Sequence, residues 1–147
     1  MKIHTFGSEL SIEAITRLLL ARDIQPTQQR LKIAQVMFAA PQHLSAEQVL
    51  AKVEDKSVHV SKATVYNTLG LFVERGLINQ VVVDPQRIFY DSNTEPHYHF
   101  YNVDTGTLVD VDPACIPVAI PPTLPDGTEM AGVEVIVRVR QKNSGVC

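Results

Sequence analysis

Cysteine is scarce in this chain, which has two cysteines in 147 residues and no tryptophan. Cys115 and Cys147 form no Cys-x-x-Cys pair, so the sequence gives no support for a zinc site built from thiolates. If the chain binds a metal, the ligands are therefore expected to be nitrogen and oxygen atoms.

Long apolar runs are also missing, since no stretch approaches the roughly 20 residues needed to cross a bilayer. The first residues lack the apolar core of a secretory signal. Hydrophobic residues make up 45% of the chain and charged residues 20%, which is typical of a soluble globular protein. We expect a cytoplasmic protein without a membrane partner. Disulfides are rare in that compartment, so both cysteines should be free thiols.

Positive charge is scarce in the second part of the chain, although the net charge of the whole is only −3. Residues 1–90 carry ten Lys or Arg against eight Asp or Glu, a balance of +2. Residues 91–147 carry three Lys or Arg against eight Asp or Glu, a balance of −5. The first part could approach phosphate and the second could hold cations, although +2 is far from a strongly basic patch.

Four helices are predicted in the first part, because apolar residues recur there at helical spacing behind hydroxyl residues that can cap a helix. The four caps are Ser11, Thr27, Ser45 and Ser61. The segment 45–48 has the form of a capping box, a hydroxyl cap followed three residues later by an amide. The third helix should end near Glu54, and Gly76 is a natural C-cap residue for the fourth.

A β-hairpin is predicted directly after these helices. Residues 77–83 and 87–90 are rich in branched and aromatic side chains, and Asp84-Pro85-Gln86 between them reads as a short turn. Helices followed by a hairpin are the order of a winged helix-turn-helix, in which the helix before the hairpin enters the major groove of DNA.

A polar linker, Ser92 to Pro96, separates this part from a smaller second module. We predict a DNA-binding domain over 1–91 and a dimerisation and metal-sensing domain over 92–147, with strands at 97–103, 107–111 and 133–140. The fold class is α+β: an N-terminal winged helix-turn-helix followed by a small α/β dimerisation domain. A core of about 55 residues is marginal by itself, so we expect a homodimer with strand 133–140 in its interface.

The pattern His97-Tyr98-His99 is the strongest chemical signal. Strand alternation puts both imidazoles on one face and Tyr98 on the other, towards the core. Asp91 precedes the pattern and Asp110 follows it. Imidazole and carboxylate ligands together suit iron, manganese or zinc better than calcium or magnesium.

The chain also resembles a known family through four motifs in order: Thr27-Gln28-Gln29-Arg30, Leu44-Ser45-Ala46-Glu47, Ala63-Thr64-Val65-Tyr66-Asn67-Thr68-Leu69 and His97-Tyr98-His99. Together these look like the ferric uptake regulator family, from about Leu18 to Arg140. The resemblance implies a dimeric, metal-dependent transcriptional regulator, most often a repressor, that binds operator DNA.

The regulatory site implied by the peroxide-response branch is three His and two Asp, here His43, Asp91, His97, His99 and Asp110. Fe2+ or Mn2+ is the implied metal, with Zn2+ possible in purified protein, and His43 or His97 is the implied target of peroxide oxidation. Asp at the first acidic position favours this branch. The tail from Val133 to Arg140 and the end of the fourth helix look closest to the iron-response branch, so peroxide and iron both remain candidate signals.

Two departures and two alternatives complete the prediction. Asn102 and Thr105 stand where many relatives have the first Cys-x-x-Cys pair, so we expect no structural zinc. Haem sensing at the His97/His99 cluster is an alternative within the family, although the chain has no Cys-Pro motif. A non-haem iron enzyme is an alternative from another class, but five ligands leave few open positions, so we expect no enzyme.

The fourth helix is the predicted recognition helix. Residues on its exposed side are expected to contact DNA, together with residues of the wing and residues that touch the DNA backbone. They are Ser61, Lys62, Thr64, Tyr66, Asn67, Thr68, Arg30, Arg75 and Arg87. Tyr66 could offer its ring to a thymine methyl group.

Overall fold

The computed structural model describes residues 10–54 and 59–143. The chain divides into two compact units, residues 1–94 and 95–147, and the division falls inside the polar linker at 92–96. Cys147, one of the two expected free thiols, lies outside the described residues. No helix in the described ranges is both long and apolar enough to span a bilayer.

The first unit contains four helices: α1 (Ile12–Leu20), α2 (Gln28–Phe38), α3 (Ala46–Glu54) and α4 (Lys62–Glu74). Their starts follow the predicted caps. The hydroxyls of Ser11, Thr27 and Ser61 accept hydrogen bonds from the backbone N–H groups of Ala14, Arg30 and Thr64. Each bond satisfies a donor that the first helical turn leaves unpaired.

The capping box of α3 is confirmed in both directions. The Gln48 N–H donates to the Ser45 hydroxyl at 3.2 Å, and the Ser45 N–H donates to the Gln48 side-chain oxygen at 2.9 Å. At the end of α4, Gly76 has a φ of +72°, a left-handed conformation that glycine adopts without strain. The predicted helix-ending role of Gly76 is therefore confirmed.

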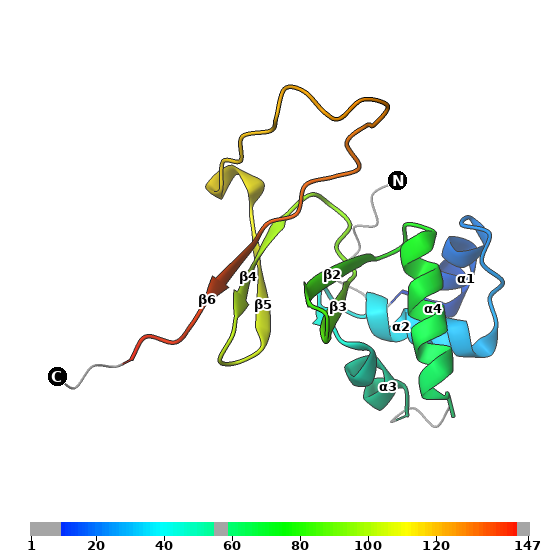
Figure 1. Cartoon of the computed structure of the whole chain (residues 1–147). Helices are drawn as coiled ribbons and strands as arrows, with labels where there is room; N and C mark the ends of the chain where they lie inside the picture. The colour runs from blue at the N-terminus through cyan, green and yellow to red at the C-terminus, as the bar shows by residue number, and fades with distance from the viewer. Residues whose placement is uncertain (1–9, 55–58, 144–147) are drawn as a thin grey trace. The chain divides into compact units, whose positions relative to one another are not determined.

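The predicted hairpin is present as β2 (Asn79–Asp84) and β3 (Arg87–Asp91). Leu77 and Ile78, expected at the start of the first strand, instead precede it as buried core residues. A two-residue strand, β1 (His43–Leu44), completes an antiparallel sheet in the order β1-β3-β2 (Figure 1). Sequence analysis did not predict β1, because two residues carry no periodicity.

The core of the first unit joins all four helices to the sheet. Its fully buried side chains include Leu19, Ile33, Val49, Leu69 and Phe72. Each of the four helices thus buries an apolar face in this core. Helix α4, the predicted recognition helix, is thus fixed by its inner face, which leaves its other face to solvent.

The second unit is a three-stranded sheet in the order β5-β4-β6, made of β4 (Tyr98–Asn102), β5 (Thr107–Val111) and β6 (Ile136–Val139). β4 pairs antiparallel with β5 and parallel with β6. The helical content within 95–143 is one three-residue 3-10 helix, Pro113–Cys115. The proline-rich chain between this turn and β6 makes the long excursion drawn in yellow and orange in Figure 1.

Two expectations for the second unit need correction. The last strand covers 136–139 instead of 133–140, because its ladder with β4 ends where β4 ends, at the pair Asn102–Val139. Tyr98 is only partly buried, whereas Tyr101 is 1% exposed. Tyr101 shares the face of His99, so the buried aromatic ring lies on the histidine side of the sheet and not opposite to it.

Candidate functional site

His43 and Asp91 form a pair within the first unit. They are direct partners in the β1–β3 ladder, and His43 Nε2 lies 3.0 Å from Asp91 Oδ2. The Asp91 side chain is 1% exposed, and its Oδ1 accepts a hydrogen bond from the Asn93 N–H at 2.9 Å. The two carboxylate oxygens of Asp91 therefore have different partners: Oδ1 accepts a hydrogen bond in the turn after β3, and Oδ2 faces the imidazole of His43.

The position of His43 depends on the segments on either side of it. The Gln42 side-chain amide donates to the Val36 carbonyl at 2.6 Å, which ties the chain back to α2. Leu44 is buried and the capping box of α3 begins at Ser45. A histidine between two anchored residues has little freedom to leave the sheet, so the His43–Asp91 pair is a preorganised feature of this unit.

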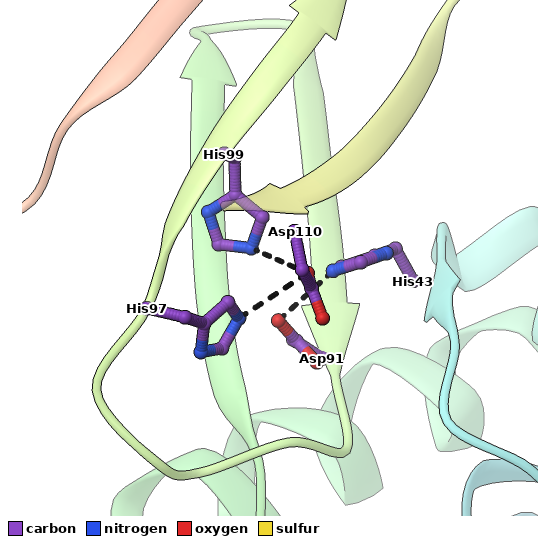
Figure 2. Close-up of side chains that lie close together, drawn as sticks. All are labelled: His43, Asp91, His97, His99 and Asp110. Atoms are coloured by element: carbon purple, nitrogen blue, oxygen red, sulfur yellow. Dashed lines mark ion pairs between the residues drawn. The ribbon is translucent and has the colours of Figure 1, made fainter. Parts of the chain in front are cut away.

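The second unit gathers three more candidate ligands. His99 and Asp110 are direct partners in the β4–β5 ladder, and His97 lies one residue before β4. The Nε2 atoms of both imidazoles lie 3.5 Å from the same oxygen, Asp110 Oδ1. The two rings meet edge to face, with centroids 4.5 Å apart. Figure 2 shows these side chains as sticks, with the ion pairs dashed.

The tautomer of His97 follows from its hydrogen bond. Its Nδ1 lies at hydrogen-bond distance from the Glu95 carbonyl oxygen. A carbonyl can only accept, so Nδ1 carries the proton and donates. In the neutral ring the lone pair is then on Nε2, the nitrogen that faces Asp110. A backbone carbonyl on the remote nitrogen is a common way in which proteins orient a metal-ligating imidazole.

The donor set suits a transition metal. Three imidazole nitrogens and two carboxylate oxygens are available, and each of the five residues can offer one ligand atom. Such mixed nitrogen and oxygen donors favour iron, manganese or zinc, and the set contains no thiolate. The one cysteine that the structure describes, Cys115, is exposed and free. The donor types in the two units therefore suit a divalent transition metal.

The outer face of α4 presents most of the predicted DNA contacts. Ser61, Lys62, Tyr66 and Asn67 are exposed and Thr64 is partly buried. The prediction that Thr68 lies on the exposed side is wrong, because this residue is 4% exposed. It follows Val65 by three positions, which puts it on the inner face of the helix.

The three predicted arginine contacts differ in their surroundings. Arg87 is exposed in the β2–β3 hairpin, with Nε 3.8 Å from Asp84 Oδ2. The Arg30 guanidinium donates to the Gln25 carbonyl at 3.1 Å. Arg75 donates to the Arg22 carbonyl at 3.1 Å while Arg22 donates to the Arg75 carbonyl at 2.8 Å. This reciprocal pair joins the ends of α1 and α4, so Arg75 has a structural task.

One residue that contacts the outer face of α4 was not among the predicted site residues. Glu47, noted only within the motif that carries the resemblance, accepts a hydrogen bond from the Tyr66 hydroxyl through Oε1. The same oxygen lies 3.9 Å from Lys62 Nζ. No local pattern signals this contact, because α3 and α4 meet only through tertiary packing.

Residues 21–126 match the sequence family described as the ferric uptake regulator family. This chain belongs to that family. It is 28% identical to the peroxide-responsive repressor PerR of Staphylococcus epidermidis over 109 residues, which cover 74% of this chain and 71% of the repressor. The resemblance inferred from four short motifs is thus confirmed.

Solved structures agree with the family assignment. The ferric uptake regulator from Pseudomonas aeruginosa with manganese superposes with a TM-score of 0.67 at 26% identity, covering 86% of this chain and 97% of that one. The regulator from Vibrio cholerae gives a TM-score of 0.69 at 19% identity, covering 86% and 99%. The predicted α+β architecture, an N-terminal winged helix-turn-helix followed by a small second domain of the dimerisation type, is confirmed.

Proposed function

We propose that this chain is a metal-dependent transcriptional regulator that binds operator DNA as a homodimer and senses hydrogen peroxide. The observation that carries the proposal is the presence of two His/Asp groups, His43 with Asp91 in one unit and His97, His99 and Asp110 in the other. A regulator needs a site whose occupancy changes the relation between its parts, and two half-sets of ligands provide one.

Both groups are proposed to hold the same ion. Asp91 and His97 are six residues apart in the chain, so their Cα atoms can never be more than about 22 Å apart. This covalent limit holds whatever the orientation of the units. The short connection therefore gives each ligand group a high effective concentration at the other group.

The metal would stabilise one arrangement of the two units by its differential affinity for that arrangement. Its positive charge would also offset the acidic balance of the second unit, and ferrous iron would add reactivity towards hydrogen peroxide. If DNA favours the same arrangement, metal and DNA strengthen each other's binding by the same factor. In a dimer, that arrangement would set the spacing of the two α4 helices on a two-fold-symmetric operator.

A second copy of the chain is proposed to cover one face of the β5-β4-β6 sheet. Alternation and register place Phe100, Val109 and Val139 on the face opposite His99 and Asp110. All three apolar side chains are exposed, and Val109 is 57% exposed. An apolar sheet face on a unit this small is a typical dimer surface.

Peroxide is preferred over iron as the signal because the staphylococcal relatives are peroxide-responsive repressors. The proposed oxidation adds one oxygen atom of hydrogen peroxide to an imidazole carbon of His43 or His97, and the other oxygen leaves as water. The imidazole loses two electrons and the peroxide gains them. Plain iron sensing is the second candidate, favoured by the 26% identity to the Pseudomonas regulator.

The proposal is tested with protein loaded with Fe2+ or with Mn2+ and treated with the same dose of hydrogen peroxide. A duplex selected from a randomised pool by the Mn2+ form serves as the operator probe. With Fe2+, peptides containing His43 or His97 should gain the mass of one oxygen atom, and operator binding should fall in step. With Mn2+, neither change should occur. An iron form that keeps unmodified histidines and full operator affinity would exclude peroxide sensing and favour iron as the signal.

A further inference from the structure

One carboxylate oxygen on α3 contacts two polar side chains that α4 could present to phosphate. Glu47 Oε1 accepts the hydrogen bond of the Tyr66 hydroxyl and lies 3.9 Å from Lys62 Nζ. The Lys62 ammonium also lies 5.9 Å from the centre of the Tyr66 ring. The three side chains form one cluster, which we call the Glu47 cluster.

The Glu47 cluster lies on the surface, not in the core. The side chains of Lys62 and Glu47 are 66% and 59% exposed, and Tyr66 is 40% exposed. An exposed ion pair of this kind contributes little to folding stability. An acidic side chain on a surface that must approach phosphate opposes that approach, so its presence calls for another explanation than stability.

Tyr66 also has room to move. It borders a cavity of about 350 Å³ in the first unit, lined by the start of α3 and by the β2–β3 hairpin, including Arg87 and Phe89. The hydrogen bond to Glu47 therefore helps to hold the ring in the position seen here. In agreement with this contact, hydrogen bonding to Tyr66 lowers the pKa of Glu47, and the same bond raises the pKa of Tyr66.

We propose that Glu47 is a specificity-determining residue of the DNA-binding surface, which positions Tyr66 towards base edges and withholds Tyr66 and Lys62 from phosphates of non-operator DNA. The inference rests on the proposed operator binding. At the operator, the Glu47–Tyr66 bond stays intact and the ring contacts bases. On other sequences, tight binding would require Tyr66 and Lys62 to leave Glu47 for the backbone, and the carboxylate opposes this step.

Removing the negative charge of Glu47 should therefore raise the affinity for non-operator DNA more than the affinity for the operator. Each additional phosphate contact steepens the dependence of log K on log salt by about 0.9. In Glu47→Gln, Lys62 becomes available for one such contact. Non-specific affinity at low salt should rise about three- to tenfold, while operator affinity changes less than twofold.

The test compares four proteins: wild type, Glu47→Gln, Tyr66→Phe and the double variant. Glu74→Gln is the matched control, because it removes the same charge from the far end of α4. Fluorescence anisotropy with the selected duplex and with a scrambled duplex of equal length, over a salt series, gives both affinities and both slopes. Thermal melts check that each variant is folded.

The specificity ratio should fall about threefold or more in Glu47→Gln and in Tyr66→Phe, because the first substitution removes the charge that strengthens the Glu47–Tyr66 bond and the second removes its donor. The fall in the double variant should be clearly less than the sum of the two single effects, because both substitutions act on the same bond. Glu74→Gln should keep the wild-type ratio. Equal gains on both duplexes, or no change in ratio or slope, would overturn the role of Glu47 while leaving operator binding intact. If the wild type selects no duplex from the pool, the proposed function itself fails, and this inference with it.

Discussion

Single residues in this chain have roles that depend on which atom faces which partner. Asp91 uses one oxygen for a turn and the other for His43, and His97 uses Nδ1 for a carbonyl and Nε2 for Asp110. The five candidate ligands could be predicted from residue type and motif. Their atomic assignment could not, because it depends on strand register and on a carbonyl two residues away.

At the same scale, the Glu47–Tyr66 bond predicts a measurable titration. The bond to Glu47 raises the pKa of the Tyr66 phenol above its ordinary value and lowers that of Glu47. The bond is therefore complete between the two pKa values. It is weakened when the pH falls below the pKa of Glu47 and is lost when the pH rises above the pKa of Tyr66. Ultraviolet titration of Glu47→Gln, with Tyr66→Phe as the reference, should show the Tyr66 midpoint shifted towards lower pH. An unmoved midpoint would mean that the bond is absent in solution.

At the scale of elements, local signals predicted the helices and the β2–β3 hairpin, but not the pairing of strands that lie far apart in the chain. Capping residues at 11, 27, 45 and 61 fixed where the helices begin, because caps act over three or four residues. The strand β1 exists only through its pairing with β3, nearly fifty residues away. The error at Thr68 is of another kind, because helical spacing from Val65 already places this residue on the inner face of α4.

The capping box provides a prediction for α3. Ser45→Ala removes the acceptor for the Gln48 N–H, so the free energy of unfolding should fall by about 1 kcal/mol. Urea denaturation followed by circular dichroism measures this change. Gln29→Ala, an exposed position in the first turn of α2, is the control and should stay within about 0.5 kcal/mol of wild type. If Ser45→Ala leaves the free energy of unfolding unchanged, the capping box adds no stability.

At the scale of the whole molecule, dimerisation is the first expectation. The exposed apolar face of the β5-β4-β6 sheet is proposed as the contact between two chains. Analytical ultracentrifugation at micromolar concentration should show a dimer for the wild type and a monomer for Val109→Asp, because a buried unpaired carboxylate is costly. Val82→Asp, which places the same charge at an exposed valine on β2 of the first unit, is the control and should remain dimeric. A monomeric wild type would contradict the proposed assembly.

The central claim is that His/Asp groups from both units hold one metal ion, and Mn2+ binding measured by isothermal titration calorimetry tests it most directly. The wild type should bind one ion per chain at this site. His43→Ala and His99→Ala should each weaken the same Mn2+ binding by tenfold or more. The loss of binding free energy in the double variant should be far smaller than the sum of the two single losses, because both residues serve one site. His59→Ala, an exposed histidine outside both groups, should bind like the wild type. Two independent sites, each abolished by one substitution and indifferent to the other, would contradict the account.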